Sequence, residues 1–332
     1  MHPPDVSDMP AACSRLILDT DLGVDIDDLG AVAVMHHLAA AGRCRILGVV
    51  TDLGQRHAAG CIDAVGAWCG RRPPIGQPDW PSTQPDSYAD RVYHARSAAG
   101  DDLVDGDACE RAVPLLKRLL TEAEDRSVVV ATIGPLWHQA DLLADQAGRD
   151  LVDAKVDRFV VMGGHTPNTP CSDTDHGVEP NFMGGQSDCT RRFLDACPRP
   201  IVFCGSEVGN RRFGYGTGAE LETLPHGHPV KIGYRDFFDR PPDWAPEIRS
   251  NSIGDWSVWD LVTVLHAVGG AGLSGCREVA GMTNHADASG WNHWRPRRCG
   301  DPEHAYLEPM LPPAELARER VLPWLLGASG AG

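Results

Sequence analysis

The sequence lacks the features that mark several large classes of protein. No apolar run is long enough to span a membrane. The stretch "MHPPDVSDMPAACSR" has no basic start followed by an apolar run, so it does not resemble a signal peptide. The 11 cysteines are scattered without CxxC pairs, as is typical of reduced, mostly buried thiols. These absences predict a cytoplasmic protein that does not span a membrane.

Positive charge is also scarce. The chain has 30 Lys and Arg against 46 Asp and Glu, which gives a formal charge of −16 with His neutral. An acidic surface argues against binding to nucleic acid or to an anionic membrane. It leaves open an acidic site that holds a cation.

Apolar, β-rich runs alternate with helical patterns along the 332 residues. Strands are expected over 15–20, 45–51, 127–134, 157–164 and 200–208. Helices are expected over 28–42, 56–69, 107–124, 138–148, 187–196 and 256–268. This alternation predicts an α/β fold with an open, mainly parallel (mixed) sheet and helices on both faces. Residues 72–105 and 210–255 are expected to be long loops, and 285–312 an irregular tail.

Five aspartates crowd the junction between the first strand and the first helix, in "LILDTDLGVDIDDLGAVAVMHHLA". They are Asp19, Asp21, Asp25, Asp27 and Asp28. Helix capping explains one or two of them. Carboxylates this close repel and raise one another's pKa unless a cation lies among them. A hard cation such as Ca²⁺, which binds oxygen ligands, is therefore the favoured explanation.

Two other acidic motifs are alternatives for this stretch. An EF-hand loop does not fit, because Val24 and Gly30 occupy the positions that need Gly and Glu. A phosphatase of the haloacid-dehalogenase type also places DxD after an apolar strand. It expects Thr or Val where this chain has Gly23, and it leaves Asp27 and Asp28 without a role. That phosphatase stays open as an alternative.

Several segments, taken in order, resemble the inosine-uridine-preferring nucleoside hydrolases. "DTDLGVDIDDLGAVA" resembles the DxDxGxDD signature of that family, and "VVATIGPLWHQADLL" its GPLTN segment. "FVVMGG" resembles its central strand, "EPNF" its ExN motif, and "VWDLVTVLHAV" its carboxyl-terminal segment. Other details look closer to a divergent bacterial branch. The resemblance implies a nucleoside-hydrolase-like fold, with an extension over 1–14 and one catalytic domain over 15–325.

The resemblance also implies the metal ligands. Asp21 would bind Ca²⁺ and activate the attacking water. Asp28 and Asp260 would be further ligands, and Trp137 would offer its backbone carbonyl. Asp25 is an additional candidate, because the loop departs from the shorter family form by two residues.

Contacts to the ribose hydroxyls are implied for Asp27, Glu179 and Asn181. Asp52 stands near a place where relatives have a polar contact residue, and it is the weakest of these candidates. Asp19 would orient the loop rather than touch the metal.

The implied reaction is calcium-dependent hydrolysis of an N-glycosidic bond of a ribonucleoside or related riboside, through an oxocarbenium-like transition state. In many relatives a His before the last metal-binding Asp helps the nucleobase to leave, but here that residue is Trp259. His138, His165 and His176 are the candidate acids. Trp259 also keeps open a non-catalytic riboside-binding protein. A homodimer or homotetramer is expected, and the nucleobase stays unassigned.

Overall fold

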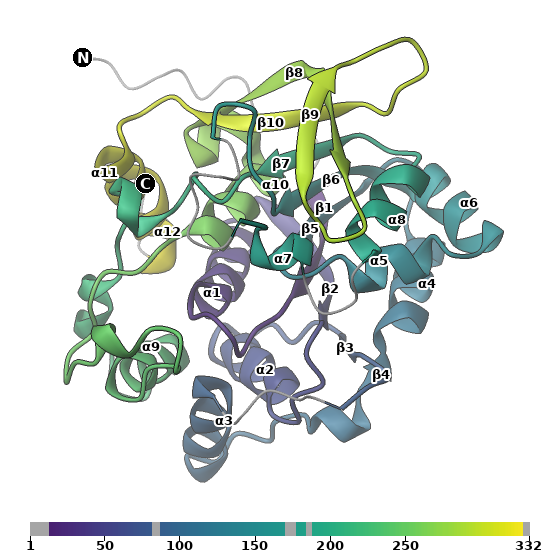
Figure 1. Ribbon diagram of the computed structural model, residues 1–332. Helices are drawn as coiled ribbons and strands as arrows, with labels where there is room; N and C mark the ends of the chain where they lie inside the picture. Colours follow the sequence, from purple (N-terminus) through teal and green to yellow (C-terminus); the bar gives the residue numbers. More distant parts are fainter. Residues whose placement is uncertain (1–12, 82–86, 170–176, 184–187, 328–332) are drawn as a thin grey trace.

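A ten-stranded sheet runs through the centre of the computed structural model, which describes residues 13–81, 87–169, 177–183 and 188–327 (Figure 1). The strand order is β4-β3-β2-β1-β5-β6-β7-β10-β8-β9. Neighbouring strands are parallel from β4 to β10, and β8 pairs antiparallel both with β10 and with the edge strand β9. The expected open, mainly parallel α/β sheet is therefore confirmed.

The elements have the following bounds. The strands are β1 (Ser14–Thr20), β2 (Cys44–Thr51), β3 (Ile75–Gln77), β4 (Glu110–Arg111), β5 (Val128–Thr132), β6 (Val156–Met162), β7 (Ile201–Cys204), β8 (Cys276–Ala286), β9 (Asn292–Pro296) and β10 (His304–Pro309). The α-helices are α1 (Asp27–Ala40), α2 (Ala58–Trp68), α3 (Tyr88–Ala98), α4 (Ala112–Glu122), α5 (Trp137–Leu142), α6 (Gln146–Lys155), α7 (Pro180–Met183), α8 (Cys189–Ala196), α9 (Pro229–Asp239), α10 (Trp259–Ser274), α11 (Pro313–Leu316) and α12 (Leu322–Leu325).

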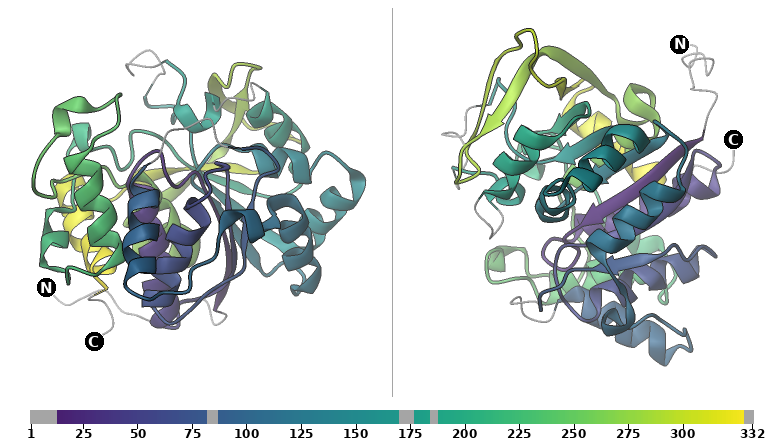
Figure 2. Two further views of the ribbon diagram at one scale, coloured as in Figure 1. Left: turned by 90° about the horizontal axis from the view of Figure 1, so that it is seen from below. Right: turned by 90° about the vertical axis from the view of Figure 1, so that its right-hand side faces the viewer.

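Helices cover both faces of the sheet (Figure 2). Leu16 and Leu18 of β1 pack into the core that contains α1, α2, α9 and α10. Ile17, between them, points to the other face and packs into the core that contains α4, α5, α6 and α8. Because side chains alternate along a strand, a strand buried on both faces must be apolar throughout. This is why the central strands were visible in the sequence.

Three stretches expected to be irregular contain regular structure. The region 72–105 holds β3 and α3, the region 210–255 holds α9, and the tail 285–312 holds β9 and β10. These three expectations were wrong, and for α3 the reason is a shortage of buried apolar positions. In α3, for example, only Tyr88, Ala89 and Val92 are buried. A segment with so few apolar positions resembles a loop in sequence.

Three helices also differ from their expected bounds. The helix expected over 138–148 is two helices, because the Asp145 carboxylate accepts from the Gly148 N–H at 2.7 Å and caps the start of α6. The α-helix expected over 107–124 begins only at Ala112. Helix α10 continues past residue 268, with non-helical backbone at Gly269 and Gly270.

The described residues contain no helix with both the length and the apolar character of a membrane span. Nor does any cysteine in these ranges form a disulfide.

Candidate active site

The carboxyl ends of neighbouring parallel strands bring the sequence motifs together. The Asp52 N–H donates to the Thr20 carbonyl at 2.9 Å, and the Ile133 N–H donates to the Asp19 carbonyl at 2.8 Å, so β1, β2 and β5 end level with one another. A Cβ on Gly134 would lie 2.8 Å from the Asp21 nitrogen and 2.4 Å from Asp52 Oδ2. Only glycine allows this approach, and ligand sites in such sheets form at this edge.

Two helix starts meet above this edge. Asp27 and Asp28 lie in the first turn of α1, and Asp260 lies in the first turn of α10. Their ligand oxygens lie within 4.8 Å of one another, and all three side chains are buried. The Asp260 N–H donates to Asp27 Oδ2 at 3.2 Å, and the Thr20 hydroxyl donates to Asp28 Oδ1.

The electrostatics of this trio favour a cation. Burial raises the pKa of Asp27, Asp28 and Asp260 well above the usual range, and repulsion from neighbouring aspartates raises each pKa further. A divalent cation would remove this repulsion and take up all three carboxylates. The donor set is oxygen only, which suits Ca²⁺ or Mg²⁺ better than Zn²⁺. The trio therefore fits a hard metal ion.

Asp21 and Asp25 border the trio but are not part of it. The partly exposed Asp21 has its pKa raised to about 7, mainly by burial and also by the charges of Asp25, Glu179 and Asp19. Burial likewise raises the pKa of Asp25 to about 6. Asp25 Oδ1 accepts from the Trp256 Nε1–H at 2.5 Å and from the Ile26 N–H at 2.6 Å. One oxygen of Asp25 is thus already engaged by the protein.

Glu179 and Asn181 face the same space from the loop after β6. Glu179 accepts backbone N–H groups of Gly164 (2.9 Å), Asn181 (3.0 Å) and Phe182 (3.1 Å). Burial raises its pKa to about 7 despite these bonds. The Asn181 amide donates to the carbonyl oxygens of Ile133 and Met162 at 3.1 and 3.3 Å. Both side chains are therefore held firmly by backbone groups, and the Glu179 charge acts on Asp21.

Asp52 joins a second, separate polar group. Ligand atoms of Asp19, Asp52 and His138 lie within 4.8 Å of one another, all buried. Asp19 also accepts from the Gln139 amide, and the His138 Nε2–H donates to the Thr51 carbonyl at 2.9 Å. Asp19 thus points away from the trio of Asp27, Asp28 and Asp260. Sequence reasoning did not predict this group, although Asp19 is near the end of β1 and Asp52 and His138 follow the ends of β2 and β5.

Aromatic side chains surround the carboxylates of Asp21, Asp25, Asp27, Asp28 and Asp260, which together are called the acidic floor. Trp137 begins α5, and its ring lies 5.5 Å from that of Trp80. The Trp259 Nε1–H donates to the Ser206 carbonyl at 2.6 Å. The guanidinium of Arg211 lies 4.2 Å from the ring centre of Trp256. Trp80 and Arg211 fall in regions expected to be loops, and Trp256 begins the helix expected over 256–268, so their position around the floor was not predicted.

The candidate acids differ in position. His138 belongs to the separate group with Asp19 and Asp52, and its Nε2–H donates to the Thr51 carbonyl. His165 Nδ1 lies 2.8 Å from the hydroxyl of Ser206, the same residue whose carbonyl accepts from Trp259. Burial lowers the pKa of His165. His176 lies outside the described residues.

Comparisons with known proteins support the fold. No protein-family model matches the sequence, and no curated protein matches it. Among solved structures, an inosine-uridine preferring nucleoside hydrolase from Bacillus anthracis has a TM-score of 0.65 at 14% identity, covering 95% of this chain and 99% of that one. The plant nucleoside hydrolase PpNRh1 has a TM-score of 0.68 at 17% identity, covering 95% and 99%.

A third similar structure is the type III effector protein XopQ complexed with adenosine diphosphate ribose. Its TM-score is 0.62 at 16% identity, covering 98% of this chain and 96% of that chain. At these identities the likeness concerns the fold. The chain therefore has the nucleoside hydrolase fold, which confirms the resemblance found in the sequence at that level.

Proposed function

We propose that this protein hydrolyses the N-glycosidic bond of a ribonucleoside or related riboside, with Ca²⁺ bound on its acidic floor. The observation that carries this proposal is the buried trio of Asp27, Asp28 and Asp260 at the strand ends of a nucleoside hydrolase fold. Helix capping does not require three carboxylates from two helices to converge. A metal site does.

Several residues would hold the cation. Asp28 and Asp260 are the central ligands, with Asp21 and the Trp137 carbonyl completing the set implied by the family resemblance. Asp27 lies in the same trio as Asp28, so it is close enough to serve as a ligand as well as to contact ribose. Asp25 is a secondary candidate, because Trp256 and Ile26 already occupy one of its oxygens. When bound, a divalent cation orients vicinal hydroxyls and lowers the pKa of a bound water.

Asp21 is the proposed general base. The partly exposed Asp21 carboxylate, at the border of the trio, would accept the proton of the attacking water. The remaining carboxylates stabilise the positive charge that develops on the sugar as the bond breaks. Asn181 and Glu179 would orient the ribose beside them, and Asp52, fully buried beneath the floor, would act on the sugar only if the site opens.

A second candidate function is riboside binding without turnover. Trp259 donates its indole N–H to the Ser206 carbonyl and has no proton to give a leaving base. The similar protein XopQ was solved with adenosine diphosphate ribose bound, which supports a binding role on this fold. The phosphatase alternative finds no support in the fold comparison.

The deciding experiment measures reducing sugar released from a panel of nucleosides and from p-nitrophenyl riboside, with Ca²⁺ or with a chelator. We expect calcium-dependent release, near-stoichiometric calcium by elemental analysis, and loss of both in Asp28→Asn and Asp260→Asn. Asp243→Asn, an exposed acid elsewhere, is the matched control. Tight riboside binding without release over hours favours the binding protein. Zinc bound in place of calcium, or phosphate release without sugar release, contradicts the proposal.

The assembly is a separate expectation. A small-molecule riboside is the only partner proposed, and a homodimer or homotetramer stays a prediction that analytical ultracentrifugation can test.

A further inference from the structure

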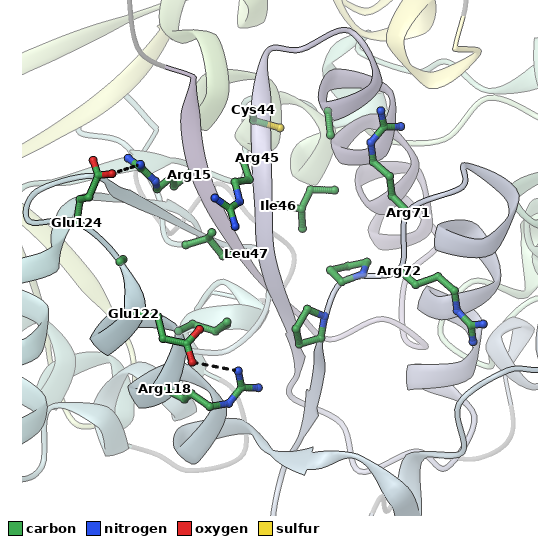
Figure 3. Close-up of a pocket in the computed structure, with 15 residues that line it drawn as sticks. Arg15, Cys44, Arg45, Ile46, Leu47, Arg71, Arg72, Arg118, Glu122 and Glu124 are labelled. Atoms are coloured by element: carbon green, nitrogen blue, oxygen red, sulfur yellow. Dashed lines mark hydrogen bonds and ion pairs between the residues drawn. The ribbon is translucent and has the colours of Figure 1, made fainter.

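Two regions outside the acidic floor differ in their suitability for a cation. A groove of about 650 Å³ at the start of β1 has five arginines in its lining against two glutamates, which disfavours a cation (Figure 3). Figure 3 shows Arg15 turned toward Glu124 and Arg118 toward Glu122, so the acids there are already paired. A hollow of about 300 Å³ between helices α3 and α9 is different, because aspartates outnumber arginines in its lining.

Three side chains of metal-binding types come together beside this hollow. His57 stands directly before α2, and Asp90 and His94 lie one turn apart on the same face of α3. Asp90 Oδ1 lies 2.5 Å from His57 Nδ1 and 3.4 Å from His94 Nε2. One ligand atom from each residue lies within 4.8 Å of the others. The two imidazoles therefore converge on one carboxylate oxygen.

The spacing of these atoms is close to that of a zinc site. At Zn–N and Zn–O distances of roughly 2.0 to 2.2 Å, the ligand atoms of a tetrahedral ion lie about 3.4 Å apart. The distance between His94 Nε2 and Asp90 Oδ1 already has this value. The contact between His57 and Asp90 would have to widen by only about 1 Å, and two bonds to the metal would replace its hydrogen bond.

One ligand of the cluster is held in place and another can adjust. The His57 ring stacks on Tyr93, with ring centres 4.3 Å apart and an angle of 15° between the rings. The His94 side chain is 60% exposed, so it can turn toward an ion without disturbing the core. The hollow borders Asp90 and His94, and water from it can complete a four-coordinate shell.

The charges around the cluster do not oppose a cation. Arg56, which precedes His57, pairs with Asp105 at 2.6 Å. Arg240, in the lining of the hollow, pairs with Asp236 at 2.8 Å. The remaining charges of the lining are one arginine and two aspartates, Arg91, Asp90 and Asp239. A cation at Asp90 therefore meets a net negative charge.

We propose that His57, Asp90 and His94 bind one Zn²⁺ ion per chain and tie the start of α2 to α3. Two imidazole nitrogens and one carboxylate oxygen are ligands that zinc prefers, whereas the acidic floor offers oxygen alone and suits Ca²⁺. A hydrogen-bonded pair of His57 and Asp90 needs no second histidine one turn further along α3. The inference does not depend on the proposed function, because it shares no residue with the acidic floor and needs no turnover.

The test is calorimetric titration of the full chain with Zn²⁺ in the presence of excess Ca²⁺. We expect one zinc ion to bind per chain. Loss of a group that merely orients a ligand typically lowers metal affinity about 10- to 100-fold, so His57→Ala and His94→Ala should each weaken zinc binding at least about tenfold. His226→Ala, which removes an exposed histidine elsewhere, should change zinc affinity less than about twofold. Asp28→Asn should leave zinc affinity unchanged, because Asp28 belongs to the acidic floor.

Melting temperatures separate loss of a ligand from loss of the fold. Without zinc, His94→Ala should melt at the native temperature, because the side chain is largely exposed. Zinc should raise the melting temperature of the native chain but not that of the His57→Ala/His94→Ala double variant. Zinc binding of native affinity in His94→Ala would overturn the proposal, as would absence of zinc binding to the native chain. Zinc binding that is lost in Asp28→Asn and kept in His57→Ala would place the ion on the acidic floor and would also overturn it.

Discussion

Asn181 divides its side chain between the protein and the site. Its amide nitrogen ties the loop after β6 to the ends of β5 and β6 through the carbonyls of Ile133 and Met162. Its Oδ1 has no donor among the residues described by the structure, so it can accept from a ribose hydroxyl. One residue can therefore affect both the stability of the loop and the grip on the substrate.

Replacing Asn181 by Ala should raise KM and lower kcat on ribosides, because hydroxyl contacts that strengthen in the transition state affect both. The melting temperature should also fall by about 2–4 °C, as the loss of roughly 1 kcal/mol predicts. Kinetics on ribosides and on the matching deoxyribosides provide the check. The kinetic loss should shrink when the contacted hydroxyl is already missing. Wild-type kinetics on every riboside would make the ExN match a coincidence.

Trp259 decides which leaving groups the site can release. Its indole N–H is held by the Ser206 carbonyl, so it cannot protonate a departing base. General acids typically contribute about 10²- to 10⁴-fold in rate. We therefore expect slow release from ordinary nucleosides and faster release from p-nitrophenyl riboside, whose leaving group needs no acid. Parallel rate measurements on the two substrate types test this.

Asp21→Asn is the control for that comparison, because it keeps the side-chain size while losing basicity. It should abolish release from both substrate types. Retained release from p-nitrophenyl riboside in Asp21→Asn would remove Asp21 as the base. Fast release from a natural nucleoside by the native protein would point to another acid. His165, which contacts the Ser206 hydroxyl, would be the first residue to replace by mutation.

At the scale of elements, helix α3 supports the aspartate loop from the side. The Tyr88 hydroxyl accepts from the Gly23 N–H at 2.9 Å and donates to the Asp25 carbonyl at 2.6 Å. These bonds fix the backbone of the loop that precedes α1 and so help to position the Asp27 and Asp28 carboxylates. A helix taken for a loop in the sequence is thus part of the support of the site.

Tyr88→Phe should cost about 1–3 kcal/mol, because it leaves a buried N–H and a buried carbonyl without partners. It should also weaken calcium binding, since the loop loses its alignment. Thermal melting and calcium titration measure the two effects. Tyr93→Phe, on the same helix but with its ring stacked on His57, is the matched control. Equal calcium affinity in the native protein and Tyr88→Phe would contradict the supporting role of α3.

The sequence predicted the elements that are buried on both sides. Leu16, Ile17 and Leu18 are all fully buried, and such a run has few structural alternatives. It failed for α3 and for the edge strand β9, where exposure leaves no clear periodicity. It also failed for α9, whose buried Val230, Tyr234 and Phe237 stand in a region rich in Pro, Gly and Asp. In β9, for instance, only Asn292 is buried. Polar elements are held by neighbours far away in the chain, which a local pattern does not contain.

The acidic character of the site was predictable, but its internal pairing was not. The order of the aspartates indicated a strand-end cation site, because that edge gathers the motifs of several strands. Whether Asp27 or Asp21 faces Asp260 depends on how α1 and α10 pack. The engagement of Asp25 depends on Trp256, over two hundred positions away in sequence. Such contacts arise only from the assembled fold.

On the scale of the whole molecule, the buried carboxylates link stability to pH and to metal. The pKa of Asp25 is raised to about 6, and the pKa values of Asp21 and Glu179 to about 7. Between pH 4 and 7 the unfolded chain gives up these protons while the folded chain keeps them. Since the unfolded state then binds fewer protons, stability must fall as pH rises through this window. Calcium reverses the trend, because its ligands bind as carboxylates.

With a chelator present, the melting temperature should therefore be highest near pH 5 and fall by about 5 °C or more by pH 8. Added calcium should raise it most at pH 8 and least at pH 5. Calorimetric scans across pH, with and without calcium, measure both trends. Asp28→Asn should flatten the pH dependence and remove most of the calcium effect, because the amide cannot ionise. Asp243→Asn should change neither the pH dependence nor the calcium effect, and it is the control for the loss of one negative charge at the surface. A melting temperature that rises with pH in the chelator, or a calcium shift of equal size at every pH, would show that the carboxylates of the floor are not the groups that bind the ion.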